Sequence, residues 1–368
     1  MRWPHGAATA ARGAIKAVAT LAAVLATAWG ALALWYQLPR WPAAAAAGAW
    51  CVIGIAAAVA PWRKAGTAHG KGVALACAVA AMLMFAWWRS IVPSHERAWA
   101  DDVARLLASE VDGDRVTLHN VRNFDWQSET RYTPRWETRQ YDLGQLESAD
   151  LILSYWMGPH IAHTLVSFGF ADGRKLVFSL EIRKERHEAF SALGGFFRKF
   201  EEVLIAADEH DIVRTRSNAR GEQVYLYRLR ATHAQLRAVF LAYLRQAAQL
   251  HDEPTFYNTL TSNCTTVIFD LARQIAPGLP LDWRLLASGH FAEYAHDQGA
   301  LTAGYTYAVL RQRGYINPRA LKTDAGDAAG FSRAIRVGIP GVPAGETQPL
   351  GAGRASTSAG ESRAPVTR

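Results

Sequence analysis

The chain has 368 residues, of which 50% are hydrophobic, and a formal net charge of +8. This length and apolar content allow a membrane segment together with one soluble domain that has a sizeable core, and they exclude a small scaffold held by disulfides. The basic residues are dispersed among acidic ones and no nucleic-acid recognition motif accompanies them, so we expect an anionic membrane surface as partner and no nucleic acid.

Three nearly uncharged apolar stretches lie at the start of the chain. They cover about residues 15–36, 41–62 and 72–92, and each approaches or exceeds the ~20 residues that span a bilayer. A secretory signal peptide is the alternative for the first stretch, but that stretch is too long and has no convincing cleavage site. We therefore predict a membrane domain over residues 1–94 with three transmembrane helices.

Basic residues are unevenly distributed around these stretches. The first loop between them contains only Arg40, whereas the N-terminal segment and the second loop contain Arg2, Arg12, Lys16, Arg63, Lys64 and Lys71. Positive residues favour the cytoplasmic side of a membrane. The pattern predicts a multi-pass protein of the bacterial inner membrane, with the chain after about residue 93 in the periplasm.

Residues 95–341 are predicted to form one periplasmic α+β domain. Apolar spacing predicts an amphipathic helix over 95–110. Runs rich in β-branched and aromatic residues predict strands at 115–124, 149–156, 163–170, 175–182 and 223–230, followed by helices at 232–250 and 263–275. A turn at 171–174 pairs the third and fourth strands in a hairpin. Residues 342–368 have the composition of a disordered tail.

Cys264 is the only cysteine of the soluble part, because Cys51 and Cys77 lie in the apolar stretches. One of the polar residues 261–263 is expected to cap the helix that follows. Cys264 would then lie in the first turn, where the unpaired N–H groups and the helix dipole favour the nucleophilic thiolate. A small buried structural cysteine is the alternative of about equal weight.

A nucleophilic cysteine needs a base and a group that orients that base. His163 begins a predicted strand, whereas His160 follows Gly158-Pro159 in a turn, so His163 is preferred as the base. Glu181 lies on the partner strand of the hairpin and can face a strand histidine. A solvated or structural histidine remains the alternative.

Two other segments give weaker signals. Asp208, Glu209, His210 and Asp211 occur together, but their spacing matches no metal site, and a charged turn before a strand explains them equally well. We expect no metal and no cofactor. The apolar and aromatic residues of 283–301 are compatible with an acyl-chain groove, although ordinary helix packing is the preferred explanation.

Six blocks resemble, in the same order, the family of Lnb N-terminal periplasmic domains. They are W-x-G-P-H-I-A-H-T (156–164), S-L-E-I-R-K-E (179–185), G-F-F-R-K-F-E (195–201), A-D-E-H-D (207–211), V-Y-L-Y-R-L (224–229) and Y-N-T-L-T-S-N-C-T-T (257–266). The resemblance covers about residues 110–340. It implies a lipoprotein N-acyltransferase-like enzyme in a fold similar to permuted papain-like or NlpC/P60-type hydrolases, with Cys264 and His163 as the reacting pair and Glu181 in the orienting position.

The arrangement of the chain departs from that family in one respect. In the acyltransferase type the membrane helices follow the catalytic domain, whereas here all three precede it, so the resemblance leaves the substrate open. We expect a membrane-anchored acyltransferase that forms a Cys264 thioester from a lipid or lipoprotein acyl ester. Asn263 would help to stabilise the oxyanion, and His160 would have a supporting role.

Two alternative functions remain open at this stage. One is a membrane-tethered periplasmic cysteine peptidase or amidase that acts on cell-wall peptides with the same pair. The other is a non-catalytic envelope binding module with a buried Cys264. Membrane lipid is the expected partner, a lipoprotein substrate is a further candidate, and the oligomeric state stays open.

Overall fold

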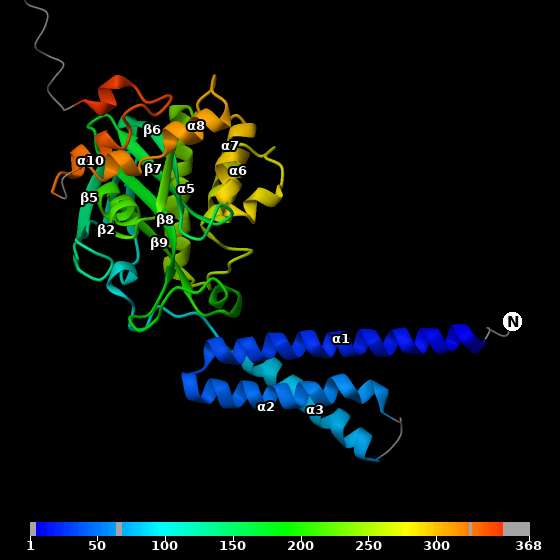
Figure 1. Cartoon of the computed structure of the whole chain (residues 1–368). Coiled ribbons are helices and arrows are strands. Elements are labelled where there is room, and N and C mark those ends of the chain that lie inside the picture. The colour runs from blue at the N-terminus through cyan, green and yellow to red at the C-terminus, as the bar shows by residue number, and fades with distance from the viewer. Residues whose placement is uncertain (1–4, 64–67, 324–325, 349–368) are drawn as a thin grey trace, which may run out of the picture. The chain divides into compact units, whose positions relative to one another are not determined.

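The computed structural model describes residues 5–63, 68–323 and 326–348 and divides the chain into two compact units (Figure 1). The helical unit comprises Met1–Arg97, Glu188–Glu201 and Thr255–Thr259. The sheet unit comprises Ala98–His187, Glu202–Pro254 and Leu260–Arg368. The helical unit therefore includes two later segments of the chain, whereas the predicted membrane domain ends at residue 94.

Three long helices form most of the helical unit: α1 (His5–Gln37), α2 (Arg40–Val59), which continues into η1 (Ala60–Trp62), and α3 (Ala68–Ser90). The segments Thr9–Gln37, Arg40–Trp62 and Gly70–Ser90 are long and apolar enough to cross a membrane. The prediction of three such helices is confirmed. Arg2 and Lys64, which contributed to the predicted orientation, lie outside the described residues.

The segment Glu188–Glu201 contacts the helices of its unit through hydrogen bonds. The Nε2 atom of Gln37 donates to the carbonyl oxygen of Phe197 over 2.6 Å. The guanidinium of Arg198 donates to the carbonyl oxygen of Trp88 over 2.8 Å and packs over the ring of the same tryptophan. These contacts explain why residues 188–201 group with the helices.

An eight-stranded sheet is the centre of the sheet unit. Its strand order is β1-β2-β9-β8-β7-β6-β10, and β5 pairs with β2 off this path. The strands are β1 (Ala108–Asp112), β2 (Arg115–Arg122), β5 (Trp136–Asp142), β6 (Leu146–Tyr155), β7 (Ala162–Phe170), β8 (Lys175–Arg183), β9 (Glu201–Ala207) and β10 (Gln223–Arg228). The strands β3 (Asp125–Trp126) and β4 (Tyr132–Thr133) form a separate pair.

The predicted hairpin is present as β7 and β8, which pair antiparallel with Val166 opposite Phe178. Gly173 in its turn has a φ of +85°, a conformation that glycine adopts without steric cost. On its other edge β7 pairs antiparallel with β6 and places His163 opposite Ser154. All five predicted strands are confirmed in position, whereas β1, β5 and β9 were not predicted.

Helices cover the sheet (Figure 1). They are α4 (Glu209–Arg214), α5 (His233–Asp252), α6 (Cys264–Ile275), α7 (Phe291–Asp297), α8 (Tyr307–Gly314), α9 (Asn317–Ala320) and α10 (Ala328–Ala334). Shorter helical turns are η2 (Asp101–Val103), η3 (Leu143–Gln145), η4 (Gly194–Phe197), η5 (Thr215–Ala219), η6 (Trp283–Leu285), η7 (Ser288–His290) and η8 (Ala344–Thr347). This mixture is compatible with the predicted α+β class, while the papain-like assignment stays a prediction.

The predicted helix over 95–110 is wrong. This segment contains only η2 and the start of β1. The guanidinium of Arg183 donates to the carbonyl oxygens of Val103 (3.1 Å) and Ala104 (2.8 Å) and packs over the ring of Trp99. A buried arginine therefore satisfies backbone groups that a helix would have paired internally.

The charged run at 208–211 is not a turn before a strand, as one interpretation held. It follows β9 and begins α4, and it is largely buried. Each carboxylate binds an arginine that is distant in sequence: Asp208 binds Arg139, Glu209 binds Arg336, and Asp211 binds Arg122. In the described part of the chain, no group of three or more His, Cys, Asp or Glu side chains is placed to hold a metal ion.

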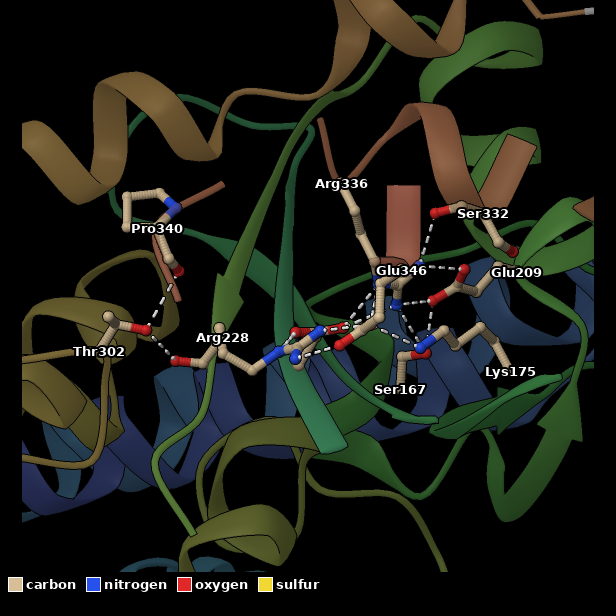
Figure 2. A network of polar contacts seen from close by, with 10 residues as sticks. Ser167, Lys175, Glu209, Arg228, Thr302, Ser332, Arg336, Pro340 and Glu346 are labelled. Atoms are coloured by element: carbon tan, nitrogen blue, oxygen red, sulfur yellow. Dashed lines mark hydrogen bonds and ion pairs between the residues drawn. The ribbon is translucent and has the colours of Figure 1, made fainter. Parts of the chain in front are cut away.

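A buried polar network connects the C-terminal segment to the sheet (Figure 2). The fully buried Arg336 binds Asp150 (Nη2 to Oδ2, 2.7 Å) and Glu209. Glu346 binds Arg228 over 2.7 Å and Lys175 over 2.9 Å. Residues 342–348 are therefore ordered against the sheet, contrary to a disordered tail that starts at 342. Residues 349–368 of that predicted tail lie outside the described residues.

Candidate active site

Cys264 is the first residue of α6, and Asn263 caps this helix, as predicted for one of residues 261–263. The Oδ1 atom of Asn263 accepts hydrogen bonds from the backbone N–H groups of Thr265 (2.9 Å) and Thr266 (3.0 Å). The Thr266 hydroxyl accepts in return from the N–H of Asn263 over 2.8 Å. This capping box fixes the start of the helix and places the Cys264 side chain in its first turn.

The start of α6 packs against β7. The backbone N–H of Thr164 donates to Sγ of Cys264 over 3.5 Å, and the hydroxyls of Thr164 and Thr265 lie 3.0 Å apart. Cys264 is buried, with 6% of its surface exposed. The residue before Thr164 is His163, so the candidate base and the candidate nucleophile are held by adjacent positions of one strand.

The imidazole of His163 is held by two side chains of β8. Its Nε2 atom lies 2.7 Å from Oγ of Ser179 and 3.1 Å from Oε1 of Glu181, and the Ser179 hydroxyl donates to Glu181 over 2.8 Å. His163 and Cys264 lie close enough for each to shift the pKa of the other. Because Nε2 faces β8, Nδ1 is the ring nitrogen left for the thiol.

The charges of this site favour an ion pair between the cysteine and the histidine. Burial and Arg216 both lower the pKa of His163, but the negative charges of Glu181 and Cys264 outweigh them and raise this pKa to about 9. Burial raises the pKa of Cys264, but His163 outweighs burial through its charge and its hydrogen bond, so the thiol pKa is lowered. Both shifts favour the pair of a thiolate beside an imidazolium, which is the reactive form that a cysteine nucleophile needs.

Glu181 is the third member of the cluster, and Arg216 supports it. Burial raises the pKa of Glu181, but the positive His163 and Arg216 hold it well below its ordinary value. The Arg216 guanidinium lies 2.9 Å from Glu181 and 3.3 Å from Glu222, and Glu222 in turn accepts a hydrogen bond from Ser154. A buried arginine that bridges two carboxylates keeps Glu181 ionised and in place.

Sequence reasoning missed Ser179, Arg216 and Glu222. Ser179 precedes Glu181 by two positions on the same strand, so the alternation of a strand puts both on one face and could have identified it. Arg216 lies in η5 and Glu222 just before β10, in segments without a local signal for this site. Their role depends on tertiary contacts.

The two supporting residues that we predicted have other contacts. Nδ1 of His160 lies 2.8 Å from Nε2 of His290, and the His160 side chain is exposed. Asn263 uses its side-chain oxygen as the helix cap. Donation from the Asn263 amide to an oxyanion stays a prediction.

One protein-family model matches part of the chain. Residues 132–289 match the Lnb N-terminal periplasmic domain, which confirms the resemblance over that range. The matched range contains His163, Glu181 and Cys264. No curated protein and no solved structure matches the chain.

Proposed function

We propose that this chain is a cysteine-dependent acyltransferase that is anchored in the bacterial inner membrane and acts from the periplasmic side on acyl esters of lipids or lipoproteins. The pairing of Cys264 with His163 at the start of α6 is the observation that carries this proposal. The match to a periplasmic domain family and the three apolar helices are consistent with such a location. A nucleophile at a helix start packed on a histidine-bearing strand also fits the papain-like arrangement that we infer.

In the first half of the proposed reaction the Cys264 thiolate attacks the carbonyl carbon of an ester. A bond forms between Sγ and that carbon, and the ester C–O bond breaks when the tetrahedral intermediate collapses. The imidazolium of His163 gives its proton to the departing alkoxide, which leaves as an alcohol. The product on the enzyme is a thioester, and His163 is then neutral.

In the second half an amine of the acceptor attacks the thioester carbonyl. Neutral His163 takes a proton from the amine, the C–S bond breaks, and an amide leaves while the thiolate and imidazolium are restored. Glu181 acts as a positioning residue, because it holds Nε2 of the ring and stabilises its positive form. The backbone N–H of Cys264 and the Asn263 amide are the proposed oxyanion donors.

The membrane anchor supports lipid as the acyl donor in this proposal. A domain tethered to the bilayer stays in the thin layer next to its surface, which raises its effective concentration toward membrane-bound substrates. The dispersed positive charge of the chain favours anionic lipid headgroups in the same layer.

Intact-protein and peptide mass spectrometry would test the proposal. The detergent-purified full chain is incubated with phospholipid and with a diacylated lipopeptide, beside a Cys264→Ala variant. We expect an acyl adduct on Cys264 that hydroxylamine removes and that the variant lacks.

Other outcomes would redirect the assignment. Alkylation of Cys264 by a charge-neutral thiol reagent without any acyl adduct would favour hydrolysis of amides by the same pair. A native Cys264 that neither acylates nor alkylates would contradict catalysis and favour a binding module.

A further inference from the structure

An apolar cavity of about 140 Å³ lies in the sheet unit between β6 and β7 on one side and α5, α6 and α7 on the other. Its walls include Leu151, Phe168, Val239, Ile268 and Phe291. Figure 1 shows these three helices beside the sheet. The described reaction centre does not use this space, although α6 is a wall of the cavity and also begins with Cys264.

The first wall of the cavity is one face of α6, the helix that begins with Cys264. A helix advances 100° and 1.5 Å per residue, so Cys264, Ile268, Ala272 and Ile275 share one face. Ile268, Ala272 and Ile275 all line the cavity. Along the helix axis they lie from ~6 Å to ~16 Å beyond Cys264. The cavity therefore begins about one helical turn from the sulfur and continues away from it.

The second wall of the cavity is one face of β7, the strand that contacts Cys264. Alternation in a strand puts Thr164, Val166 and Phe168 on one face. Thr164 contacts Cys264 and Thr265, whereas Val166 and Phe168 line the cavity. Two independent elements thus run side by side from the thiol into the same apolar space.

Tyr243 of α5 gives a third observation. It lines the cavity, is 2% exposed, and its hydroxyl has no hydrogen-bond partner among the described residues. Burial raises the pKa of Tyr243, and the negative charge of Cys264 raises it further, so the hydroxyl stays protonated and lies within electrostatic range of the sulfur. An unpaired buried donor is costly unless a ligand supplies an acceptor.

We propose that this cavity holds the alkyl chain of the acyl group that Cys264 carries, while the Tyr243 hydroxyl donates to an oxygen of that group. The inference rests on the proposed function and adds its substrate class, a linear aliphatic acyl chain. An apolar cavity of nearly this size holds one benzene molecule, so about six chain carbons fit inside. The enzyme would therefore select acyl groups by chain length.

The test compares a short ester with a longer one. The full chain is purified in digitonin, a detergent without a linear alkyl chain, and reacted with p-nitrophenyl acetate and p-nitrophenyl octanoate. Acylation of Cys264 is followed by mass. We expect the octanoyl ester to acylate the wild type faster, by on the order of 100-fold, because each buried methylene adds to recognition.

Ala272→Leu fills the cavity from α6, and Ala300→Leu fills it from another wall in case the first variant does not fold. We expect either to lower the octanoyl rate about tenfold or more and to leave the acetyl rate nearly unchanged. Ala248→Leu is the matched control, because Ala248 is exposed on α5 and outside the cavity. Tyr243→Phe should instead lower both rates, since it removes a donor and not space.

Equal acylation rates with the two esters, or a preference for the octanoyl ester that persists in Ala272→Leu and Ala300→Leu, would overturn the inference. The thioester proposal would still stand. If neither ester acylates Cys264, a binding measurement tests the cavity independently of the reaction. Thermal stability of Cys264→Ala is then measured with N-methyloctanamide, which cannot react. If the amide stabilises Cys264→Ala and adding Ala272→Leu abolishes this effect, the cavity binds alkyl chains even though the acyltransferase proposal fails. If the amide does not stabilise the protein, alkyl-chain binding in the cavity is refuted as well.

Discussion

Thr164 donates its backbone N–H to Sγ of Cys264 across 3.5 Å. The same strand carries His163 at the preceding position, so one stretch of β7 fixes the sulfur and the ring that we propose as its base. Because β7 is a central strand of the sheet with β6 and β8 on its two sides, this geometry has little freedom to change. The pair should therefore be formed before any substrate binds.

Removal of either member of the pair should abolish acylation. We expect Cys264→Ser and His163→Ala to lower the rate of adduct formation by at least about 1,000-fold with the fold retained, since the members of such a unit act together. His160→Ala should lower the rate far less, because His160 is exposed and pairs with His290. Rates are compared by mass spectrometry. Full activity of Cys264→Ser, or a larger effect at His160, would contradict this assignment.

Glu181→Gln should shift the pH profile of acylation. The negative charge of Glu181 raises the pKa of His163, which stands at about 9, so a neutral glutamine should lower this pKa. The imidazolium is then lost at lower pH, and the basic limb of the rate profile moves to lower pH. Rates are measured over the full range of pH at which the protein stays folded.

Glu110→Gln is the matched control for that profile, because Glu110 is exposed and binds His119 far from the thiol in sequence. Its profile should follow that of the wild type. A basic limb that stays in place in Glu181→Gln would show that Glu181 does not tune the histidine.

Arg336→Met should destabilise the sheet unit strongly. The fully buried Arg336 binds Asp150 and Glu209, and its loss leaves two buried carboxylates without their main cation. Breaking a buried ion pair in this way costs about 3–5 kcal/mol of unfolding free energy. Arg333→Met is the control, since within the described part of the chain Arg333 has one ion-pair contact, at 4.0 Å, and it should change stability by about 0.5 kcal/mol or less. Urea unfolding measures both, and equal values would argue against the network.

Two truncations should separate the ordered C-terminal segment from the residues after it. A chain that ends at residue 341 lacks Glu346 and leaves Arg228 and Lys175 without that partner, so its melting temperature should fall. A chain that ends at residue 348 keeps these ion pairs and should melt like the full chain. Melting is followed by circular dichroism. No difference between the two truncations would show that the Glu346 contacts add no stability.

Local patterns predicted those parts of the fold whose pairing is also local. The turn at Asp172-Gly173 specified the β7–β8 hairpin, and this hairpin brought His163 and Glu181 to within 3.1 Å. The polar residues before Cys264 predicted the helix start that Asn263 caps. Both inferences needed only neighbours along the chain.

Tertiary contacts decided the parts that were not predicted. Trp99 and Val103 have helical spacing, but Arg183 binds the backbone of their segment and holds it out of a helix. Likewise Asp211 lies in a buried helix because Arg122, distant in sequence, neutralises it. No pattern within a short window records such partners.

The burial of Cys264 also bears on oxidation. A thiolate is the form of cysteine that peroxides attack most readily, and oxidation beyond the sulfenic acid is in most proteins irreversible. Cys264 is the only cysteine after residue 77, so the sheet unit contains no second thiol that could trap a sulfenic acid as an internal disulfide. Because only 6% of the Cys264 surface is exposed, the surrounding protein shields this thiol from oxidants. Small uncharged oxidants are therefore the ones that we expect to reach Cys264, and in the proposed reaction an acyl group on the sulfur would protect it.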